Sequence, residues 1–178
     1  MSRYVQTHLG ACRESRDGGE CRVLLLGEDN PQSAEPEHAL YPYPPGCAGD
    51  RLREIVGLDE DAYLGLWRTN LCSPKWSVKA ARERSLDLLN HDAPWSVIVL
   101  LGAKVAKVFE AHVGALAPFT TGHVYGAYGP DGQSPKRFAV VALPHPSGRN
   151  RIWNDPRRKF QAQILLRQFA PEIRWGSL

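Results

Sequence analysis

Short apolar runs separated by segments of helical periodicity constrain the fold of this chain more than any other feature. Residues 21–27 (CRVLLLG), 96–102 (SVIVLLG) and 137–143 (RFAVVAL) are apolar at almost every position. Strands of that kind are buried on both faces, which is typical of parallel sheets covered by helices. Residues 68–72 (RTNLC) are a fourth candidate strand. We therefore predict an α/β fold, a three-layer sandwich with a four-stranded parallel sheet and helices on both faces.

The segments between these runs divide into helices and loops. Five segments have helical patterns: residues 50–56, 59–67, 77–89, 103–112 and 155–169. The last of them begins with Asp155 as a cap and Pro156 in its first turn. Residues 28–49 are rich in Pro and far longer than an ordinary connection, which is typical of a functional loop or of a disordered one. Residues 113–135 contain many Gly and Pro residues and are predicted to be mostly loop.

Length and composition limit the class of protein. With 178 residues, 43% of them hydrophobic, the chain is predicted to form one globular domain whose first 20 residues are an irregular extension. No apolar run approaches the roughly 20 residues of a membrane span, and the N-terminus lacks the apolar segment of a signal peptide. We expect a cytoplasmic protein without a membrane partner. The four cysteines form no C-x-x-C pair and are expected to be reduced thiols: Cys12, Cys21, Cys47 and Cys72.

Charge is distributed unevenly along the chain. From residue 136 to the C-terminus there are nine Lys and Arg residues against two acids, whereas residues 27–61 contain nine acids and two Arg residues. A basic C-terminal third is what a protein that binds phosphates would present. An ordinary solvated surface explains the same pattern equally well.

Chemically rich segments lie where the predicted strands end. GEDNP (27–31) follows the first strand, TNLCSPKW (69–76) covers the end of the second, and PHPSGRN (144–150) follows the last. In open parallel sheets the binding site lies beyond the carboxyl ends of the strands. The three segments are therefore expected to converge on one site.

These segments, in this order, resemble the motifs of the uracil-DNA glycosylase superfamily. The matching features are the GEDNP loop, Asn70 at the end of a strand, and the His145-Pro146-Ser147 loop. The resemblance covers about residues 23–164. It implies a four-stranded parallel sheet between helices, a monomer, DNA as the partner, and monofunctional hydrolysis of the N-glycosidic bond of a flipped base.

The resemblance also implies catalytic roles. His145 would donate a hydrogen bond to the base carbonyl oxygen as negative charge develops there, and Asn70 would read the edge of a pyrimidine. A residue of the GEDNP loop would hold the attacking water. This loop is one residue longer than the family pattern, so that Glu28, Asp29 and Asn30 all compete for this role. We favour Glu28, with Asn30 next; without the other motifs the same residues would read as a polar turn.

Other residues are expected to contact the base or the DNA backbone. Tyr41 or Tyr43 occupies the region where the superfamily has an aromatic that stacks on the base, although both could simply anchor the loop. Trp153 could stack or belong to the core. Residues expected at the DNA backbone are Lys75, Ser147, Gly148, Arg149 and Arg151. The cysteines do not match the arrangement of the iron–sulfur class, so that neither a cluster nor another metal or cofactor is expected.

Three functions are compatible with these residues. Uracil in DNA is the default substrate by resemblance. The long Pro-rich loop could instead enclose a bulky modified cytosine, such as glucosylated hydroxymethylcytosine in phage DNA, which would make the protein a defence enzyme. A non-catalytic DNA-binding module is the third, although an acid at Glu28 together with His145 argues against it. A nucleosidase is less favoured, because the Arg-rich loop suits a polymer.

Overall fold

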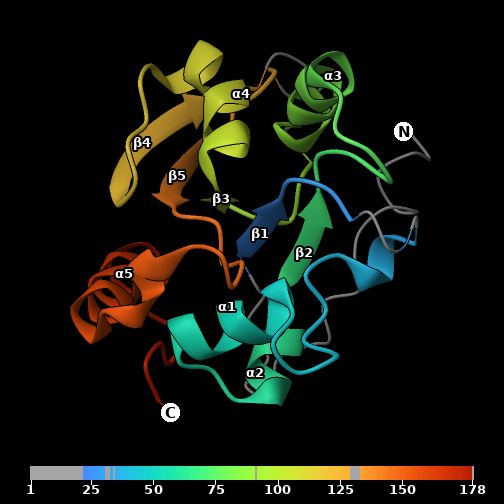
Figure 1. Cartoon of the computed structure of the whole chain (residues 1–178). Helices are drawn as coiled ribbons and strands as arrows, with labels where there is room; N and C mark the ends of the chain where they lie inside the picture. Colours follow the sequence, from blue (N-terminus) through green and yellow to red (C-terminus); the bar gives the residue numbers. More distant parts are fainter. Residues whose placement is uncertain (1–21, 31–32, 34, 91, 129–132, 178) are drawn as a thin grey trace.

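A single sheet separates two layers of helices (Figure 1). The computed structural model describes residues 22–30, 33, 35–90, 92–128 and 133–177, so that the expected extension over residues 1–20 lies outside the described part. The elements are β1 (Val23–Gly27), η1 (Pro36–His38), α1 (Ala48–Val56), α2 (Glu60–Leu64), β2 (Trp67–Asn70), α3 (Val78–Leu88), β3 (Val97–Leu101), α4 (Ala103–Val113), β4 (Thr120–Tyr125), β5 (Arg137–Leu143), η3 (Arg151–Asn154) and α5 (Pro156–Phe169). None of the described helices combines the length and apolarity that crossing a bilayer requires.

The sheet has five strands in the order β2-β1-β3-β5-β4. β2, β1, β3 and β5 are parallel, and β4 pairs antiparallel with β5 at the edge. The predicted α/β class is confirmed, but the predicted number of four strands is wrong. The fifth strand lies within residues 113–135, which were expected to be mostly loop. β4 is an edge strand in which only Val124 is buried, and its polar residues give no apolar run.

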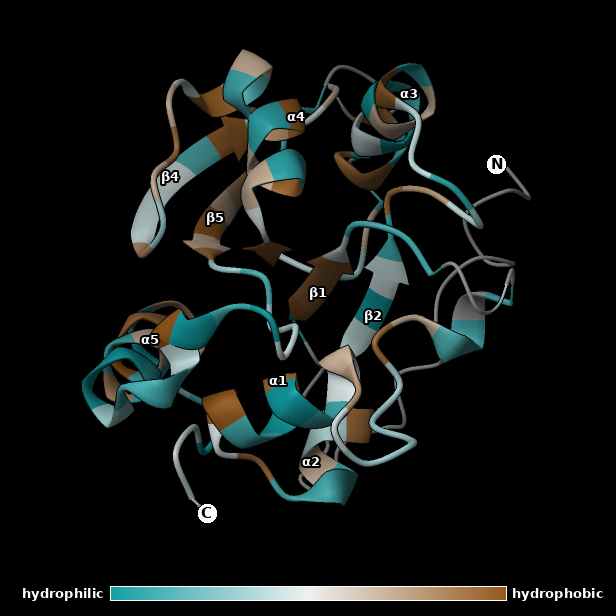
Figure 2. Cartoon of the chain, viewed as in Figure 1, coloured by the Kyte–Doolittle hydropathy of each residue, from teal (hydrophilic) through white to brown (hydrophobic). Residues whose placement is uncertain are grey.

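Two apolar cores lie on opposite faces of the sheet. Side chains alternate along each strand, so that Leu25 and Val99 face the core shared with α1, α2 and α5. Leu24 and Ile98 face the core beneath α3 and α4. Figure 2 shows β1 and much of β5 coloured as hydrophobic, and all five residues of β3 are apolar and buried. Trp153 is 1% exposed in the first core, which leaves it no stacking role.

The carboxyl ends of the four parallel strands meet at one edge of the sheet. Gly27 at the end of β1 is in register with Asn70 at the end of β2, and Leu101 of β3 is in register with Leu143 of β5. The loops that carry the predicted motifs therefore begin side by side.

Candidate functional site

His145 lies just after β5, and its turn holds the imidazole in one orientation. The Ser147 backbone N–H donates to Nδ1 of His145 at 3.1 Å. The His145 carbonyl oxygen accepts from Asn150 Nδ2 and from Trp153 Nε1, both at 3.1 Å. Since Nδ1 accepts a hydrogen bond, the neutral ring carries its proton on Nε2. The turn thus presents an N–H donor away from the loop backbone.

The surroundings of His145 favour the neutral imidazole. Burial lowers the pKa of His145, and the Lys104 ammonium acts in the same direction. The carboxylates of Glu28 and Asp29 oppose this lowering without overcoming it. The loop after β1 and the start of α4 therefore both lie near enough to the imidazole to act on its charge.

Lys104 and Glu28 form an ion pair at the edge of the site. Lys104 is the second residue of α4, and its ammonium also lies 5.6 Å from the centroid of the Trp76 ring. The hydrogen bond with Glu28 raises the pKa of Lys104. Lys104 was not expected at the site. The sequence could have indicated it, because the predicted strand at residues 96–102 ends at the same edge of the sheet and is followed directly by Ala103 and Lys104.

Two glycines make room for the polar side chains at this edge. A Cβ atom on Gly27 would lie 2.1 Å from Oδ1 of Asn70, so that the Asn70 amide occupies the space that a side chain would fill. Gly102 has a φ of +102°, and a Cβ atom there would lie 3.1 Å from Cβ of His145. Asn70 on β2 and His145 after β5 therefore flank the ends of the two central strands.

Three polar groups at this edge are available for a ligand. Within the described residues, we find no hydrogen bond or ion pair for the Asp29 carboxylate, the Asn70 side-chain amide or Nε2 of His145. Glu28 differs, because its carboxylate is paired with Lys104. Asn30 also differs, since its Nδ2 donates to the His38 carbonyl oxygen at 3.3 Å. The edge thus offers an unpaired anion, an amide and an imidazole donor.

A cleft of about 420 Å³ runs beside the outer strand β2. Asn30, Asn70 and Lys75 line it, together with Arg84 and Asp87 of α3. The cleft therefore joins three of the predicted site residues, but His145 is not among the residues that line it.

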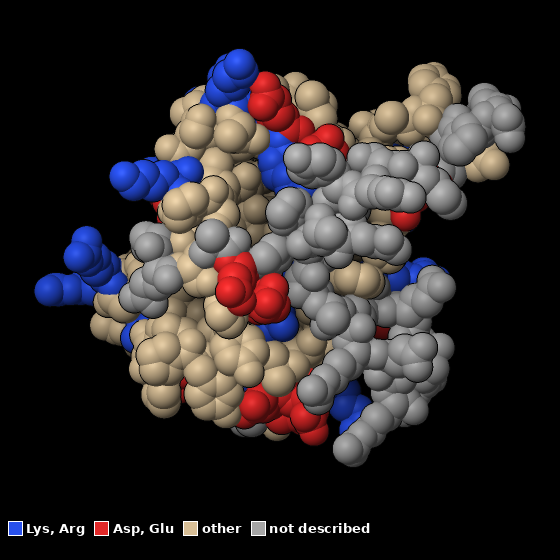
Figure 3. All heavy atoms as spheres, turned by 90° about the vertical axis from the view of Figure 1, so that its right-hand side faces the viewer, with Lys and Arg blue, Asp and Glu red and all other residues tan. Residues whose placement is uncertain are grey.

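Four of the five predicted backbone contacts are exposed, and Ser147 is half-buried. Gly148 and Arg149 are exposed in the turn after Ser147, and the exposed Arg151 begins η3. On the β2 side of the molecule, Figure 3 shows Asp and Glu side chains at the centre and lower edge of the face, and Lys and Arg side chains at its left and upper edge.

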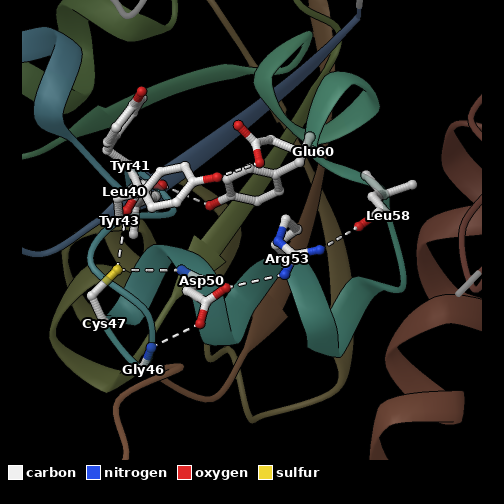
Figure 4. A network of polar contacts seen from close by, with 10 residues as sticks. Leu40, Tyr41, Tyr43, Gly46, Cys47, Asp50, Arg53, Leu58 and Glu60 are labelled. Atoms are coloured by element: carbon white, nitrogen blue, oxygen red, sulfur yellow. Dashed lines mark hydrogen bonds and ion pairs between the residues drawn. The ribbon is translucent and has the colours of Figure 1, made fainter.

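The two tyrosines of the Pro-rich loop lie near α2. The Tyr43 hydroxyl donates to Oε2 of Glu60 at 2.5 Å (Figure 4). A separate hollow of about 290 Å³ lies beside Tyr43. The Tyr41 ring centroid is 5.8 Å from that of Tyr43 and 6.0 Å from the Arg68 guanidinium carbon. Neither tyrosine lines the cleft that contains Asn70, so that stacking on a base stays a prediction.

Two of the four cysteines lie in the described part. Sγ of Cys47 accepts from the Asp50 N–H at 3.4 Å, and Sγ of Cys72 accepts from the Ser77 N–H at the same distance. Cys12 and Cys21 lie outside the described residues. No group of three or more His, Cys, Asp or Glu side chains suited to a metal is found in the described part. That the protein needs no cofactor stays a prediction.

Comparison with known proteins agrees with the residues at this edge. No curated protein matches the chain. A family model, that of the uracil DNA glycosylase superfamily, matches residues 16–167. The match includes the GEDNP loop, Asn70 and the His145 turn, the features on which the resemblance rested. The chain therefore belongs to the uracil DNA glycosylase superfamily.

Proposed function

We propose that the protein is a monofunctional DNA glycosylase that hydrolyses the N-glycosidic bond of a flipped pyrimidine and leaves an abasic site. The observation that carries the proposal is the oriented imidazole of His145, whose pKa is lowered by burial, beside the acids of the GEDNP loop. Family membership supports the same class of reaction. Uracil is the proposed substrate.

His145 is the proposed donor to the departing base. When the bond between C1′ and the base nitrogen breaks, its electron pair moves to the base and negative charge develops on a base carbonyl oxygen. Nε2–H of His145 stabilises that charge through a hydrogen bond. Removing one such donor typically costs about 10²–10³ in rate.

Asp29 is the proposed residue that holds the water. The oxygen of this water attacks C1′, which carries positive charge as the base leaves. A proton of the water passes to the Asp29 carboxylate. The support for Asp29 over Glu28 is that Glu28 is already paired with Lys104. Asn30 is less favoured, because its amide donates to the His38 carbonyl and lines the β2 cleft.

Asn70 is the residue proposed to recognise the base through hydrogen bonds. Uracil presents a carbonyl acceptor next to an N–H donor, and one amide side chain complements both. The amide of Asn70 is supported against Gly27 and is free of other hydrogen bonds within the described part. We propose that Ser147, Gly148, Arg149, Arg151 and Lys75 contact phosphates of the bound DNA.

The experiment that tests this function is an excision assay. Labelled oligonucleotides would carry uracil in a single strand, opposite G and opposite A, and alkali would reveal abasic sites. We expect the wild type to excise uracil and His145→Ala to lose at least about 10²-fold in rate. Asp29→Asn is expected to lose more than Glu28→Gln. Arg82→Gln, an exposed substitution on α3, is the matched control and should retain the wild-type rate.

Three other results of the excision assay would each change the proposed function. Excision only of hydroxymethylcytosine or its glucosylated form would replace uracil with a bulky modified cytosine and support a role in phage defence. Strand cleavage without alkali would make the enzyme bifunctional. Salt-sensitive DNA binding without excision of any of these bases would favour a binding module.

A further inference from the structure

Arg51 of α1 contacts the loop that carries His145. Its Nε donates to the Pro146 carbonyl oxygen at 3.1 Å, across 95 residues of sequence. Pro146 is buried and lies between His145 and Ser147 in the sequence. The Ser147 backbone N–H donates the hydrogen bond that orients the His145 imidazole. The position of the imidazole thus depends in part on where α1 holds the Arg51 guanidinium.

The rest of the Arg51 guanidinium faces the exposed turn. A Cβ atom built on Gly148 would lie 3.9 Å from one terminal nitrogen of Arg51 and 4.0 Å from Cζ. A guanidinium has five N–H donors, and the contact with Pro146 uses one of them. Within the described residues no carboxylate pairs with Arg51, whereas its neighbour Arg53 lies 3.1 Å from Asp50. A cation with spare donors therefore adjoins a turn whose glycine leaves space beside it.

We propose that Arg51 binds a backbone phosphate of the DNA at Gly148 and, through Pro146, positions His145. This inference rests on the proposed function and adds a residue that contacts the DNA. The terminal nitrogens would bind the phosphate oxygens while Nε keeps the Pro146 carbonyl. A planar fork of donors suits both contacts at once, which a lysine ammonium does not.

Phosphate binding and base chemistry are therefore linked through one side chain. The ligand is a phosphodiester next to the flipped nucleotide, because the Gly148 turn begins three residues after His145. Binding the phosphate orders the guanidinium, which in turn fixes the carbonyl of the residue that follows His145. Arg51 acts as a DNA ligand and as a positioning residue.

Binding is tested with an oligonucleotide that carries a tetrahydrofuran abasic analogue, so that the measurement does not depend on excision. Fluorescence anisotropy would give the affinity of the wild type, Arg51→Gln and the control Arg82→Gln at several salt concentrations. We expect Arg51→Gln to weaken binding about tenfold and to lower the salt slope by about 0.9 on a duplex or 0.7 on a single strand. Arg82→Gln should match the wild type.

A second measurement locates the phosphate. Each phosphate of the oligonucleotide is replaced in turn by an uncharged methylphosphonate. The wild type should lose affinity most at one phosphate beside the analogue, and Arg51→Gln should show no further loss at that phosphate. Equal sensitivity of both proteins at every phosphate would overturn the inference.

The positioning role is tested separately with Arg51→Lys. This variant keeps the charge and should retain the salt slope, but it loses the Nε donor to Pro146. Its single-turnover excision rate on the uracil oligonucleotide should fall about tenfold at saturating protein. An unchanged rate would remove the positioning role.

Two outcomes separate this inference from the proposed function. If the wild type neither binds the abasic oligonucleotide nor excises uracil, the glycosylase proposal itself fails. If the wild type binds and Arg51→Gln binds equally well, only the role of Arg51 fails. Should Arg51→Gln not fold, Gly148→Asp places a carboxylate beside Arg51 and is expected to cause the same losses of affinity and of methylphosphonate sensitivity.

Discussion

His145 combines a fixed orientation with a lowered pKa, and this predicts how excision depends on pH. As the pH falls from 7, the His145 ring is still neutral at pH 6.5, the ordinary pKa of a histidine, because burial opposes protonation and lowers the pKa of His145. At lower pH a proton enters Nδ1 and the hydrogen bond from the Ser147 N–H is lost. We expect the single-turnover rate to be constant down through pH 6.5 and then to fall about tenfold per pH unit below the lowered pKa.

The same shift affects stability. The unfolded chain binds the proton first, so that the free energy of unfolding should decrease as pH falls below 6.5 and stop decreasing below the folded pKa. His145→Gln should remove this part of the pH dependence of both rate and stability. If the rate of His145→Gln still fell at low pH with the same midpoint, the titrating group would not be His145.

Gly27 is predicted to be a residue of the site, although it has no side chain. A Cβ atom would lie 2.1 Å from Oδ1 of Asn70, and the end of a flexible side chain can move away. Gly27→Ala should therefore fold while displacing the Asn70 amide. We expect Gly27→Ala to lose as much excision activity as Asn70→Ala, and the double variant to lose no more than either. Additive losses in this double-mutant cycle would contradict the link between the two residues.

The sequence could locate some of these residues and not others. His145 follows a strand whose apolar pattern is readable, whereas Asn70 ends β2, whose sequence WRTN is not apolar, and was predicted from the resemblance to the superfamily motif. Lys104 and Arg51 contact residues 76 and 95 positions away, and no local pattern reports such contacts. The proposal of Asp29 over the other residues of the GEDNP loop also needed the structure, because it depends on which carboxylate Lys104 pairs with.

At the scale of elements, α1 supports the loop over residues 40–43 through a close backbone contact. A Cβ atom on Gly49 would lie 2.2 Å from the Tyr41 carbonyl oxygen and 2.3 Å from that of Leu40. The Leu40 carbonyl also accepts from the buried Tyr63 hydroxyl at 2.8 Å, so that this backbone is held from both sides. The contact fixes the Pro-rich loop to the helix that carries Arg51.

Gly49→Ala should therefore destabilise the fold. Backbone atoms cannot turn aside as the end of a side chain can, and overpacking of this kind costs about 1–3 kcal/mol. Chemical denaturation would measure the loss. Gly122→Ala in β4 is the matched control, because its Cβ atom would meet its nearest neighbour at an ordinary 3.6 Å. Equal stability of the two variants would show that α1 and the loop can separate at little cost.

Strands differed in how readily the sequence predicted them, and burial explains why. β1, β3 and β5 are buried along most of their length and give continuous apolar runs. β4 has a single buried residue, Val124, and its polar sequence TTGHVY resembles a loop. Hydrophobic patterns report burial, so that an edge strand exposed to water is missed while the central sheet is predicted.

At the scale of the molecule, charge and architecture agree on where DNA would bind. The turn after His145 carries the exposed cations Arg149 and Arg151, whereas nine of the acids of the chain lie in residues 27–61. Arg51 lies within the acidic stretch of sequence, yet the fold brings it to that turn. The approach of DNA is therefore expected over the Gly148 turn and the start of η3.

The salt dependence of binding tests this path. Each phosphate contact that is lost lowers the slope of log affinity against log salt by about 0.9 on duplex DNA. Replacing both Arg149 and Arg151 with Gln should thus lower the slope by about 1.8, and weaken all DNA sequences alike because backbone contacts carry no sequence information. The control pair Lys79→Gln and Arg82→Gln removes the same charge from exposed positions of α3. If that pair lowered the slope as much, long-range attraction to the whole protein would account for the effect, and DNA would not follow the Gly148 turn.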